Sequence, residues 1–363
     1  MKVLKKFLMF LFIAIFVVES TGCNSLKRKG NEDKNGNTQK SIEFTDIMVL
    51  SKETAGEKIY SLTDGKLKNI GDLDNVSNIV YNKDKSIQVY TNIISQGTNL
   101  TKNYISIIFK ENKNSIKGKY SYMDSRLSLD GKRVALRSFS EDSLFSAEGL
   151  SVYDVYTGKK IDFDNKIIVS GDLYRWDSEN NLLYYGVEKD EKDYGKIYSY
   201  DFQKSKREMV FDKFNGYCTF FAPTDNNSFL YMENDIDLNN MYYYDGKDNK
   251  SILITNTMDN IEDYVIDNKN HIVYFIGKET NAENNSLYKF NIEDKTLKRI
   301  TYDFPKIVDK NGGIAVDNSG KIYFCGLDTD NNSNNIYMYL NQNNSVNLIS
   351  DKRGIYRVIQ NLK

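Results

Sequence analysis

The sequence predicts an all-β fold built from about seven repeats of one four-stranded unit. Three observations lead to this prediction: a composition suited to sheets, a recurring turn followed by an apolar strand, and a nearly constant spacing between those turns. The 363 residues include 27 Tyr and 19 Phe but only 2 Pro and 1 Trp. Aromatic and β-branched side chains favour the pleated, half-buried surface of a sheet.

The repeated unit is clearest in the stretch Leu127–Phe163, which contains two predicted hairpins. One hairpin turns at Asp130-Gly131 and the other at Thr157-Gly158. Asp and Gly accept the backbone angles of tight turns, and apolar runs flank both turns. This stretch therefore supplies the pattern with which the rest of the chain is compared.

The first half of the unit is an aspartate in a polar turn followed by a short apolar strand. The turn aspartates are Asp84, Asp130, Asp177, Asp225, Asp267 and Asp317, with successive spacings of 46, 47, 48, 42 and 50 residues. The second half, an apolar strand with Tyr, a turn and another apolar strand, recurs at 58–70, 104–116, 150–161, 196–210, 241–254, 287–300 and 336–349. This period is that of a four-stranded propeller blade.

Seven second halves and six first halves leave one first half unaccounted for. The chain enters the repeat in the middle of a unit, at Ile47–Leu50, and ends with an unmatched strand, Gly354–Ile359. Pairing of these two strands would complete a seventh blade and close the ring, which removes the free edges of an open sheet. The sequence thus predicts a single β-propeller over residues 43–363.

The third unit carries a family resemblance. Ser128-Leu129-Asp130-Gly131-Lys132 with Val134–Leu136 resembles the strand-turn-strand signature of TolB-like and WD40-like propeller repeats, and Val152–Lys159 resembles their second hairpin. The resemblance covers residues 44–363 as architecture, with Leu129 in place of the usual Pro. It implies the fold and leaves the ligand open, because propellers host many unrelated functions.

Residues 1–22 have the pattern of a signal peptide. Lys2, Lys5 and Lys6 precede an apolar run, Phe7–Val18, that is too short to span a bilayer comfortably. Ser20-Thr21-Gly22-Cys23 resembles the lipobox of bacterial lipoproteins, with Ser20 in place of the usual Leu, which implies that Cys23 is lipidated and becomes the mature N-terminus. The alternative is an ordinary secretory peptide with an incidental cysteine.

Residues 23–42 contain the cysteine and a polar stretch that we expect to be a flexible tether, because it buries too little apolar surface to offset its ordering entropy. Removal of residues 1–22 deletes three of 49 basic and one of 50 acidic residues, which leaves a charge of 46 − 49 = −3. A near-neutral chain gives no reason to expect nucleic-acid binding. The expected location is the extracytoplasmic side of the cell membrane, with the chain lipid-anchored.

The residue inventory offers little for catalysis. His271 is the only histidine, and we expect it to lie at a hairpin edge and to bond backbone rather than act on a substrate. Cys218 and Cys325 fall in units five and seven, which are not neighbours in the ring. Since bridged Cα atoms lie within about 7 Å, the sequence predicts two buried free thiols.

Two further groups are weak candidates for sites. Asp328, Asp330 and Asn332 alternate as calcium ligands do, but Ser333 replaces the glycine of such loops, and a solvated loop is the favoured interpretation. The stretch Tyr174-Arg175-Trp176 could stack on sugar or peptide at a propeller rim, and packing between blades is the favoured alternative. The turn aspartates are interpreted as turn-stabilising acceptors.

The sequence therefore predicts a non-catalytic, membrane-anchored propeller that binds or scaffolds a protein, peptide or glycan. We expect a monomer, with no cofactor. The alternative is an enzyme of the lyase, glycosidase or quinoprotein type, with carboxylates or a cofactor in the central channel. Carboxylates with an Arg or Tyr between them at the channel would favour the enzyme, and a plain polar or apolar plug would favour binding.

Overall fold

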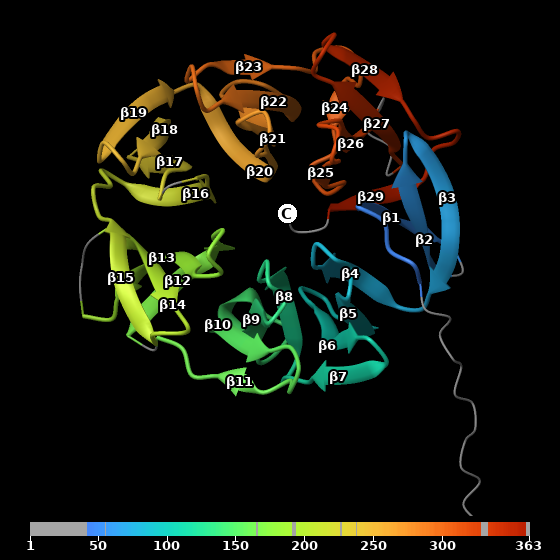
Figure 1. Cartoon of the computed structure of the whole chain (residues 1–363), viewed down its shortest axis with the longest axis horizontal. Helices are drawn as coiled ribbons and strands as arrows, with labels where there is room; N and C mark the ends of the chain where they lie inside the picture. The colour runs from blue at the N-terminus through green and yellow to red at the C-terminus, as the bar shows by residue number, and fades with distance from the viewer. Residues whose placement is uncertain are drawn as a thin grey trace, which may run out of the picture. The chain divides into compact units, whose positions relative to one another are not determined.

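The computed structural model describes residues 42–54, 56–164, 166–190, 194–225, 227–236, 238–327 and 333–360. Over these residues the chain forms seven antiparallel sheets that follow one another around a central axis, as blades of a propeller (Figure 1). The predicted fold class, an all-β propeller of seven four-stranded blades, is confirmed. The described part of the chain holds no helix with the length and apolar character that a membrane crossing requires.

The strands of each blade are numbered from the chain's start, and the innermost strand of a blade is given first here. Blade 1 contains β29 (Ile355–Gln360), β1 (Ile47–Glu53), β2 (Gly56–Thr63) and β3 (Lys66–Leu73). Blade 2 contains β4 (Val76–Tyr81), β5 (Ile87–Gln96), β6 (Thr101–Phe109) and β7 (Asn112–Ile116). Blade 3 contains β8 (Ser121–Leu127), β9 (Arg133–Phe139), β10 (Ala147–Asp154) and β11 (Lys160–Ile161), with the short 3-10 helix η1 (Leu144–Ser146).

Blade 4 contains β12 (Ile167–Trp176), β13 (Leu182–Glu188), β14 (Lys196–Asp201) and β15 (Lys206–Phe211). Blade 5 contains β16 (Tyr217–Pro223), β17 (Phe229–Asp235), β18 (Leu238–Asp245) and β19 (Lys250–Thr255). Blade 6 contains β20 (Met258–Asp267), β21 (Ile272–Glu279), β22 (Ser286–Asn291) and β23 (Leu297–Arg299). In blade 7 the inner strand is split into β24 (Ile307–Val308) and β25 (Ile314–Val316), followed by β26 (Ile322–Leu327), β27 (Asn335–Leu340) and β28 (Ser345–Leu348).

The ring closes as predicted, by pairing of the last strand with the first. β29 lies antiparallel to β1, with Ile47 opposite Gln360 and Lys52 opposite Ile355. The two strands run side by side next to the axis in Figure 1. β1 is therefore paired on both sides, and β29 takes the innermost position that the first strand takes in the other blades.

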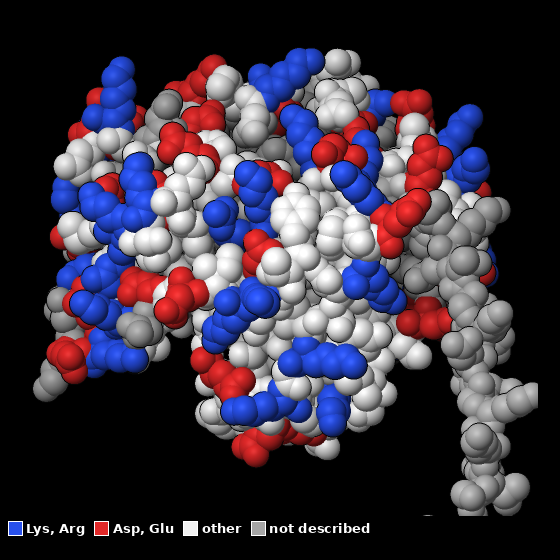
Figure 2. Space-filling view, turned by 60° about the horizontal axis from the view of Figure 1, so that its bottom comes forward, with Lys and Arg blue, Asp and Glu red and all other residues white. Residues whose placement is uncertain are grey.

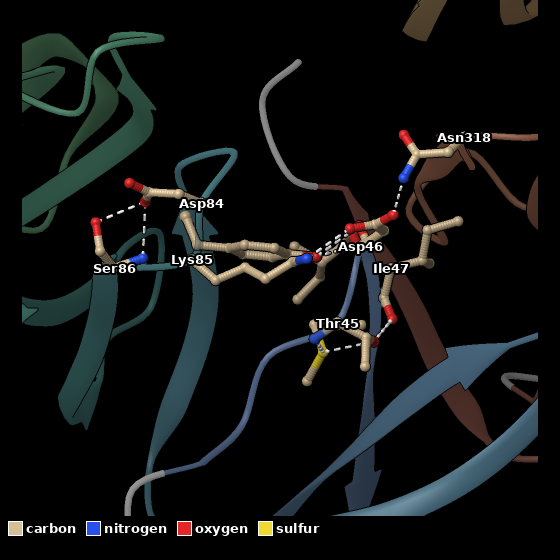
Figure 3. Close-up of polar contacts among 10 residues, drawn as sticks. Thr45, Asp46, Ile47, Asp84, Lys85, Ser86 and Asn318 are labelled. Carbon is tan, nitrogen blue, oxygen red and sulfur yellow. Dashed lines mark hydrogen bonds and ion pairs between the residues drawn. The ribbon is translucent and has the colours of Figure 1, made fainter.

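A polar junction locks this closure (Figure 3). Asp46, just before β1, forms an ion pair of 2.7 Å with Lys85 of blade 2 and accepts a hydrogen bond from Asn318 of blade 7. The hydroxyl of Tyr81 donates to the carbonyl oxygen of Asp46 at 3.0 Å and lies 3.3 Å from that of Ile359. One buried hydroxyl of blade 2 therefore contacts both the beginning and the end of the propeller.

Replacement of Tyr81 by Phe removes this hydroxyl and leaves two partly buried carbonyl groups without it. We expect Tyr81→Phe to lower the free energy of unfolding by about 1–2 kcal/mol, measured by urea denaturation. Tyr274→Phe is a matched control, because Tyr274 is equally buried and its hydroxyl has no partner among the described residues. The control should lose no stability, and equal effects of the two substitutions would refute the role of Tyr81.

The core lies between neighbouring blades rather than within any one of them. One cluster joins Leu136 of blade 3 to Ile107 of blade 2, and another joins Phe221 of blade 5 to Tyr185 of blade 4. A third joins Ala315 of blade 7 to Val49 and Val358 of blade 1, across the closure. Each blade buries its apolar side chains against the next, so the ring is stabilised as a unit.

The connections fall on two opposite faces of the ring. The turn face carries the turns between first and second and between third and fourth strands, and the loop face carries the remaining connections. On the turn face, Asp84, Asp130, Asp177 and Asp317 each accept a hydrogen bond from the backbone N–H two residues further on. The interpretation of these aspartates as turn-stabilising acceptors is confirmed, and the side chain of Asp267 serves Asn270 in the same way.

Two glycines dock β29 against blade 7. The N–H of Val358 donates to the carbonyl oxygen of Gly312 at 2.7 Å. The next residue, Gly313, has a φ of +71°, and a Cβ at this position would approach the carbonyl oxygen of Val358 more closely than real Cβ atoms do.

Cys325 of blade 7 is a buried free thiol, as is Cys218 in blade 5, which confirms the prediction of no bond between them.

Candidate functional site

Irregular pairing of the inner strands shapes the central channel. The pairing of an inner strand with its neighbour shifts in blades 2, 3, 4, 5 and 6. In β8 the irregular stretch contains Asp124, whose φ is +55°, and in β12 it contains Gly171, with a φ of +53°, and Asp172. Such bulges change the direction of side chains, and here they coincide with charged residues next to the axis.

Arginine and aspartate side chains of blade 3 and blade 4 meet in this region. The guanidinium of Arg126 lies 3.5 Å from a carboxylate oxygen of Asp172, and Asp124 accepts a hydrogen bond of 2.6 Å from Arg137. These ion pairs offset the charges of both carboxylates. The Nε atom of Arg126 is buried and has no hydrogen-bond partner among the described residues.

Arg175 is the most buried charged group of the cluster, with 6% of its surface exposed. Its Nη1 donates to the carbonyl oxygens of Asp172 and Tyr174, at 2.7 and 2.8 Å, and within the described ranges its Nε has no partner. Its guanidinium carbon lies 5.5 Å from the ring centre of Tyr264 in blade 6 and 5.6 Å from that of Phe221 in blade 5. Blades 4 and 6 are not neighbours in the ring. A side chain of blade 4 that contacts a ring of blade 6 therefore lies at the central channel, where the inner strands of all blades meet.

Two aspartates of the channel differ in acidity. Burial acts to raise the pKa of Asp172, but the positive charges of Arg175 and Arg126 outweigh it, so the pKa is lowered. Burial dominates at Asp263 of blade 6 and raises its pKa, although Arg357 of blade 1 and the same two arginines act in the opposite direction. The channel therefore combines one aspartate of lowered pKa with one of raised pKa, in a field set by arginines from three blades.

The stretch Tyr174-Arg175-Trp176, singled out in the sequence, is divided between two environments. Tyr174 is fully buried, and its hydroxyl donates to the carbonyl oxygen of Asp124 at 2.7 Å. The indole N–H of Trp176 donates to the carbonyl oxygen of Arg126 at 2.9 Å. Both rings thus pack against blade 3, and Arg175 alone extends in the opposite direction, toward the channel.

Of the other candidates, the structure describes His271 alone. His271 is an exposed turn residue with a φ of +52°, and its carbonyl oxygen accepts a hydrogen bond from the N–H of Ile292. Asp328, Asp330 and Asn332 lie outside the described residues, as does Cys23. Within the described ranges, no group of three or more His, Cys, Asp and Glu side chains has an arrangement suited to a metal ion.

Exposed apolar side chains gather on the loop face. Of fifteen exposed large apolar side chains among the described residues, eleven lie in the connections of this face or at the strand ends beside them. These eleven are Ile94, Leu144, Phe145, Ile168, Tyr194, Tyr217, Ile236, Leu238, Tyr302, Phe304 and Ile355. The other four are Met209, Leu253 and Leu348, in outer strands, and Tyr156 on the turn face. The loop face is therefore the more apolar of the two faces.

Positively and negatively charged side chains are mixed over the surface, whereas the exposed apolar side chains gather on one face. Lys and Arg alternate with Asp and Glu over the surface seen in Figure 2, and large uncharged areas separate them. Several acidic residues stand directly beside the apolar loop residues, such as Asp235 before Ile236 and Asp303 between Tyr302 and Phe304. Basic residues adjoin them as well, since the Arg299 guanidinium carbon lies 4.9 Å from the ring centre of Tyr302 and Arg353 closely precedes Ile355. The apolar side chains thus have neighbours of both charges.

Two cavities lie between blades. One of about 240 Å³ opens between blades 4 and 5 at the turn face, beside Asp177 and Pro223, and burial raises the pKa of Asp177 there. The other is a cleft of about 630 Å³ between blades 3 and 4, which runs along residues 147–151 of β10 and faces residues 167–169 of β12. Its volume is within the usual range of ligand-binding clefts.

Comparison with known proteins supports the architecture. The family described as the N-terminal region of dipeptidyl peptidase IV (DPP IV) matches residues 210–326, about a third of the chain. No curated protein matches the sequence at a significant level. The chain is thus a seven-bladed β-propeller whose blades 5 and 6 and the inner part of blade 7 are similar to that peptidase region.

Solved structures give the same result. An uncharacterized protein of Listeria monocytogenes is 12% identical, with a TM-score of 0.55 over 85% of this chain and 92% of that one. The β-propeller domain of the Trilobed protease from Pyrococcus furiosus is 18% identical, with a TM-score of 0.51 over 76% and 85%. TolB from Acinetobacter baumannii is 10% identical, with a TM-score of 0.48 over 86% and 82%. At these identities the likeness concerns the fold alone.

Sequence patterns do not identify Arg126, Asp172 and Asp263 as members of one site. The available signal is the presence of charged residues inside a strand, as in Tyr122–Leu127. That signal does not say which blades bring their charges together, since the residues are up to 137 positions apart (263 − 126).

Proposed function

We infer that this chain is a non-catalytic binding propeller, anchored on the extracytoplasmic side of the membrane through lipid on Cys23, which holds a protein or peptide against its loop face. The observation that carries the proposal is the concentration of exposed apolar side chains on that face. Two of these side chains meet across blades 4 and 5, where the ring centres of Tyr194 and Tyr217 lie 5.3 Å apart. Apolar groups that gather on one face of a soluble protein mark interaction sites. Aromatic residues, here three tyrosines and two phenylalanines, are typical of protein interfaces.

A membrane surface is the less favoured occupant of the loop face. Segments that lie on anionic membranes combine apolar side chains with Lys and Arg. Here Asp235 and Asp303 adjoin Ile236 and Phe304, and Glu141 and Asp142 precede η1. These acids interrupt the basic residues near Tyr302 and Ile355, so the face has no continuous basic rim for anionic lipid. A protein partner can pair with neighbours of both charges.

Catalysis in the channel is the second candidate function. Asp172 and Asp263, whose pKa values are shifted in opposite directions, both lie in the field of Arg126 and Arg175. Two carboxylates of different acidity beside arginines could serve as acid and base. Conversion of a peptide or glycan by the wild-type protein, abolished by Asp263→Asn, would establish this function in place of binding alone.

The loop face is tested by Phe145→Ser, Ile236→Ser and Leu238→Ser, combined in one variant of the full chain. These side chains are exposed, so the melting temperature should stay unchanged, while recovery of cross-linked partner from the protein's own membranes should fall at least tenfold. Burial of an apolar side chain at an interface contributes about 1.5–3 kcal/mol, and 1.4 kcal/mol corresponds to a tenfold change in affinity.

The matched control replaces Met209, Leu253 and Leu348 of the outer strands by Ser, since these side chains are also at least half exposed and lie away from the loop face. Equal recovery by both variants would refute the loop face as the binding surface. Binding of the wild type, but not of the loop variant, to protein-free vesicles of the native lipid would assign that face to the membrane instead. Membrane fractionation of Cys23→Ser tests the anchor separately.

A further inference from the structure

The third strand of blade 3 lacks most of its outer neighbour. β10 spans eight residues, but β11 has only two, and the two strands pair only at Val152 with Ile161 and at Tyr153 with Lys160. In each of the other six blades the fourth strand is at least half as long as the third. Figure 1 shows β11 as a short arrow at the rim of blade 3. The outer edge of β10 is therefore uncovered over residues 147–151.

The open edge presents backbone hydrogen-bonding groups. The N–H of Asp154 donates to Lys159 and its carbonyl oxygen accepts from Gly158, so the backbone of Asp154 faces the outer side. In an antiparallel ladder these directions alternate, and Val152 and Leu150 therefore face outward as well. Val152 is opposite Ile161, but Leu150 lies beyond the end of β11. Its N–H and carbonyl groups are directed to a place that no described strand occupies.

The cleft of about 630 Å³ lies along this edge. Its lining includes the uncovered residues 147–151 on one side and Ile167, Ile168 and Val169 of β12 on the other. The side chains of Leu150 and Phe163 are only partly buried at the cluster between blades 3 and 4, and Ile168 is 58% exposed. The cleft thus combines unpaired strand groups with incompletely covered apolar side chains.

We propose that this edge is a second recognition site, where an extended peptide segment of another protein adds to blade 3 as a strand beside β10. Main-chain hydrogen bonds to Leu150 would supply affinity, and alternate apolar side chains of the peptide would cover Leu150, Phe163 and Ile168. This is the mode of β-strand addition, in which backbone pairing gives affinity and side-chain pockets give specificity. The site lies along the outer edge of blade 3, and Ile168 is the one exposed loop-face side chain that lines it.

The occupant comes from another protein because the remaining chain does not fit the cleft. Residues 24–41 contain one apolar residue, Leu26, among Lys, Asn, Gly, Asp and Glu. Such a segment cannot offer apolar side chains at alternate positions. A second copy of the chain would have to bring its own edge into this cleft, which is lined by Glu148, Asp162 and Asp164 as well as by Lys160 and Lys189. Two like edges would therefore bring together surfaces with the same excess of acidic groups.

The test uses ten-residue peptides displayed as a library and selected on the wild-type protein. Ile168→Glu places a charge in the apolar wall of the cleft, and the selected peptides should bind this variant at least tenfold more weakly. Ile94→Glu is the matched control, because Ile94 is 57% exposed and lies in blade 2, away from the cleft. The control should bind the peptides as the wild type does, and so should the Phe145, Ile236 and Leu238 loop variant.

A second measurement isolates backbone pairing. Methylation of the peptide nitrogens that face β10 should abolish binding, methylation of the alternate nitrogens should not, and bound peptide should slow hydrogen exchange at the Leu150 amide. The proposal is overturned if no peptide is selected, if Ile168→Glu and Ile94→Glu bind alike, or if both methylated series bind. Concentration-dependent dimers of the wild type that Ile168→Glu abolishes would overturn it in favour of pairing between copies.

Discussion

Removal of Ile355–Lys363 is expected to abolish the cooperative unfolding of the propeller. The deletion takes away β29, exposes the edge of β1 and uncovers the core between blades 7 and 1. Three buried side chains are lost, those of Tyr356, Val358 and Ile359. At about 1.5–3 kcal/mol each, they amount to a large part of the 5–15 kcal/mol that stabilises a typical domain.

Fluorescence of Trp176 during guanidinium titration and gel filtration would measure this effect. The truncated protein should aggregate or unfold without a sharp transition. A chain that lacks only residues 361–363 is the control, and it should unfold as the complete protein does. A sharp transition with an unchanged midpoint in the longer truncation would show that the ring does not require its last strand.

Gly313→Ala is expected to have the second largest effect, a loss of more than about 3 kcal/mol in the free energy of unfolding. A left-handed φ costs an L-residue about 1–2 kcal/mol. The new methyl group would also collide with the carbonyl oxygen of Val358, and only a shift of the β29 backbone relieves a collision with backbone. That shift would weaken the hydrogen bond from Val358 to Gly312 and the packing at the closure.

The control for this substitution is Gly158→Ala. Gly158 has a φ of +67°, close to the +71° of Gly313, but the nearest atom to a Cβ there is 3.7 Å away, an ordinary contact. Chemical denaturation of the two variants should therefore differ by the cost of the collision, with Gly158→Ala losing only about 1–2 kcal/mol. Equal losses would mean that β29 moves aside freely.

The sequence was sufficient for the architecture because the propeller repeats a local pattern. Asp130-Gly131 and Thr157-Gly158 form their turns from residues within five positions, and the same turn chemistry recurs around the ring. The closure was also predictable, since an unmatched strand at each end of a repeat array has one partner left. These features depend on residues that are near in sequence or on simple counting.

The channel and the cleft were not predictable in this way. Arg175 and Tyr264 come together only because the ring brings their strands, β12 and β20, to the axis. The residue pattern of neither strand predicts that contact. The interpretation of Tyr174 and Trp176 as packing between blades agrees with their burial and hydrogen bonds, but the different direction of Arg175 follows from strand alternation combined with the bulge in β12. Likewise, the shortness of β11 is not visible in Leu150–Ile161, whose pattern matches that of a full hairpin.

The contact of Tyr81 with both Asp46 and Ile359 has a consequence for the order of assembly. Tyr81 and Ile359 are 278 residues apart, so the junction forms only after nearly the whole chain has been synthesised. Blade 1 contains the first strands to be made and is nevertheless the last blade to be completed. Until then the apolar edge of β1 has no partner, and long-range pairing of this kind is slow and exposes a chain to aggregation. A protein exported during synthesis would therefore close its ring on the far side of the membrane.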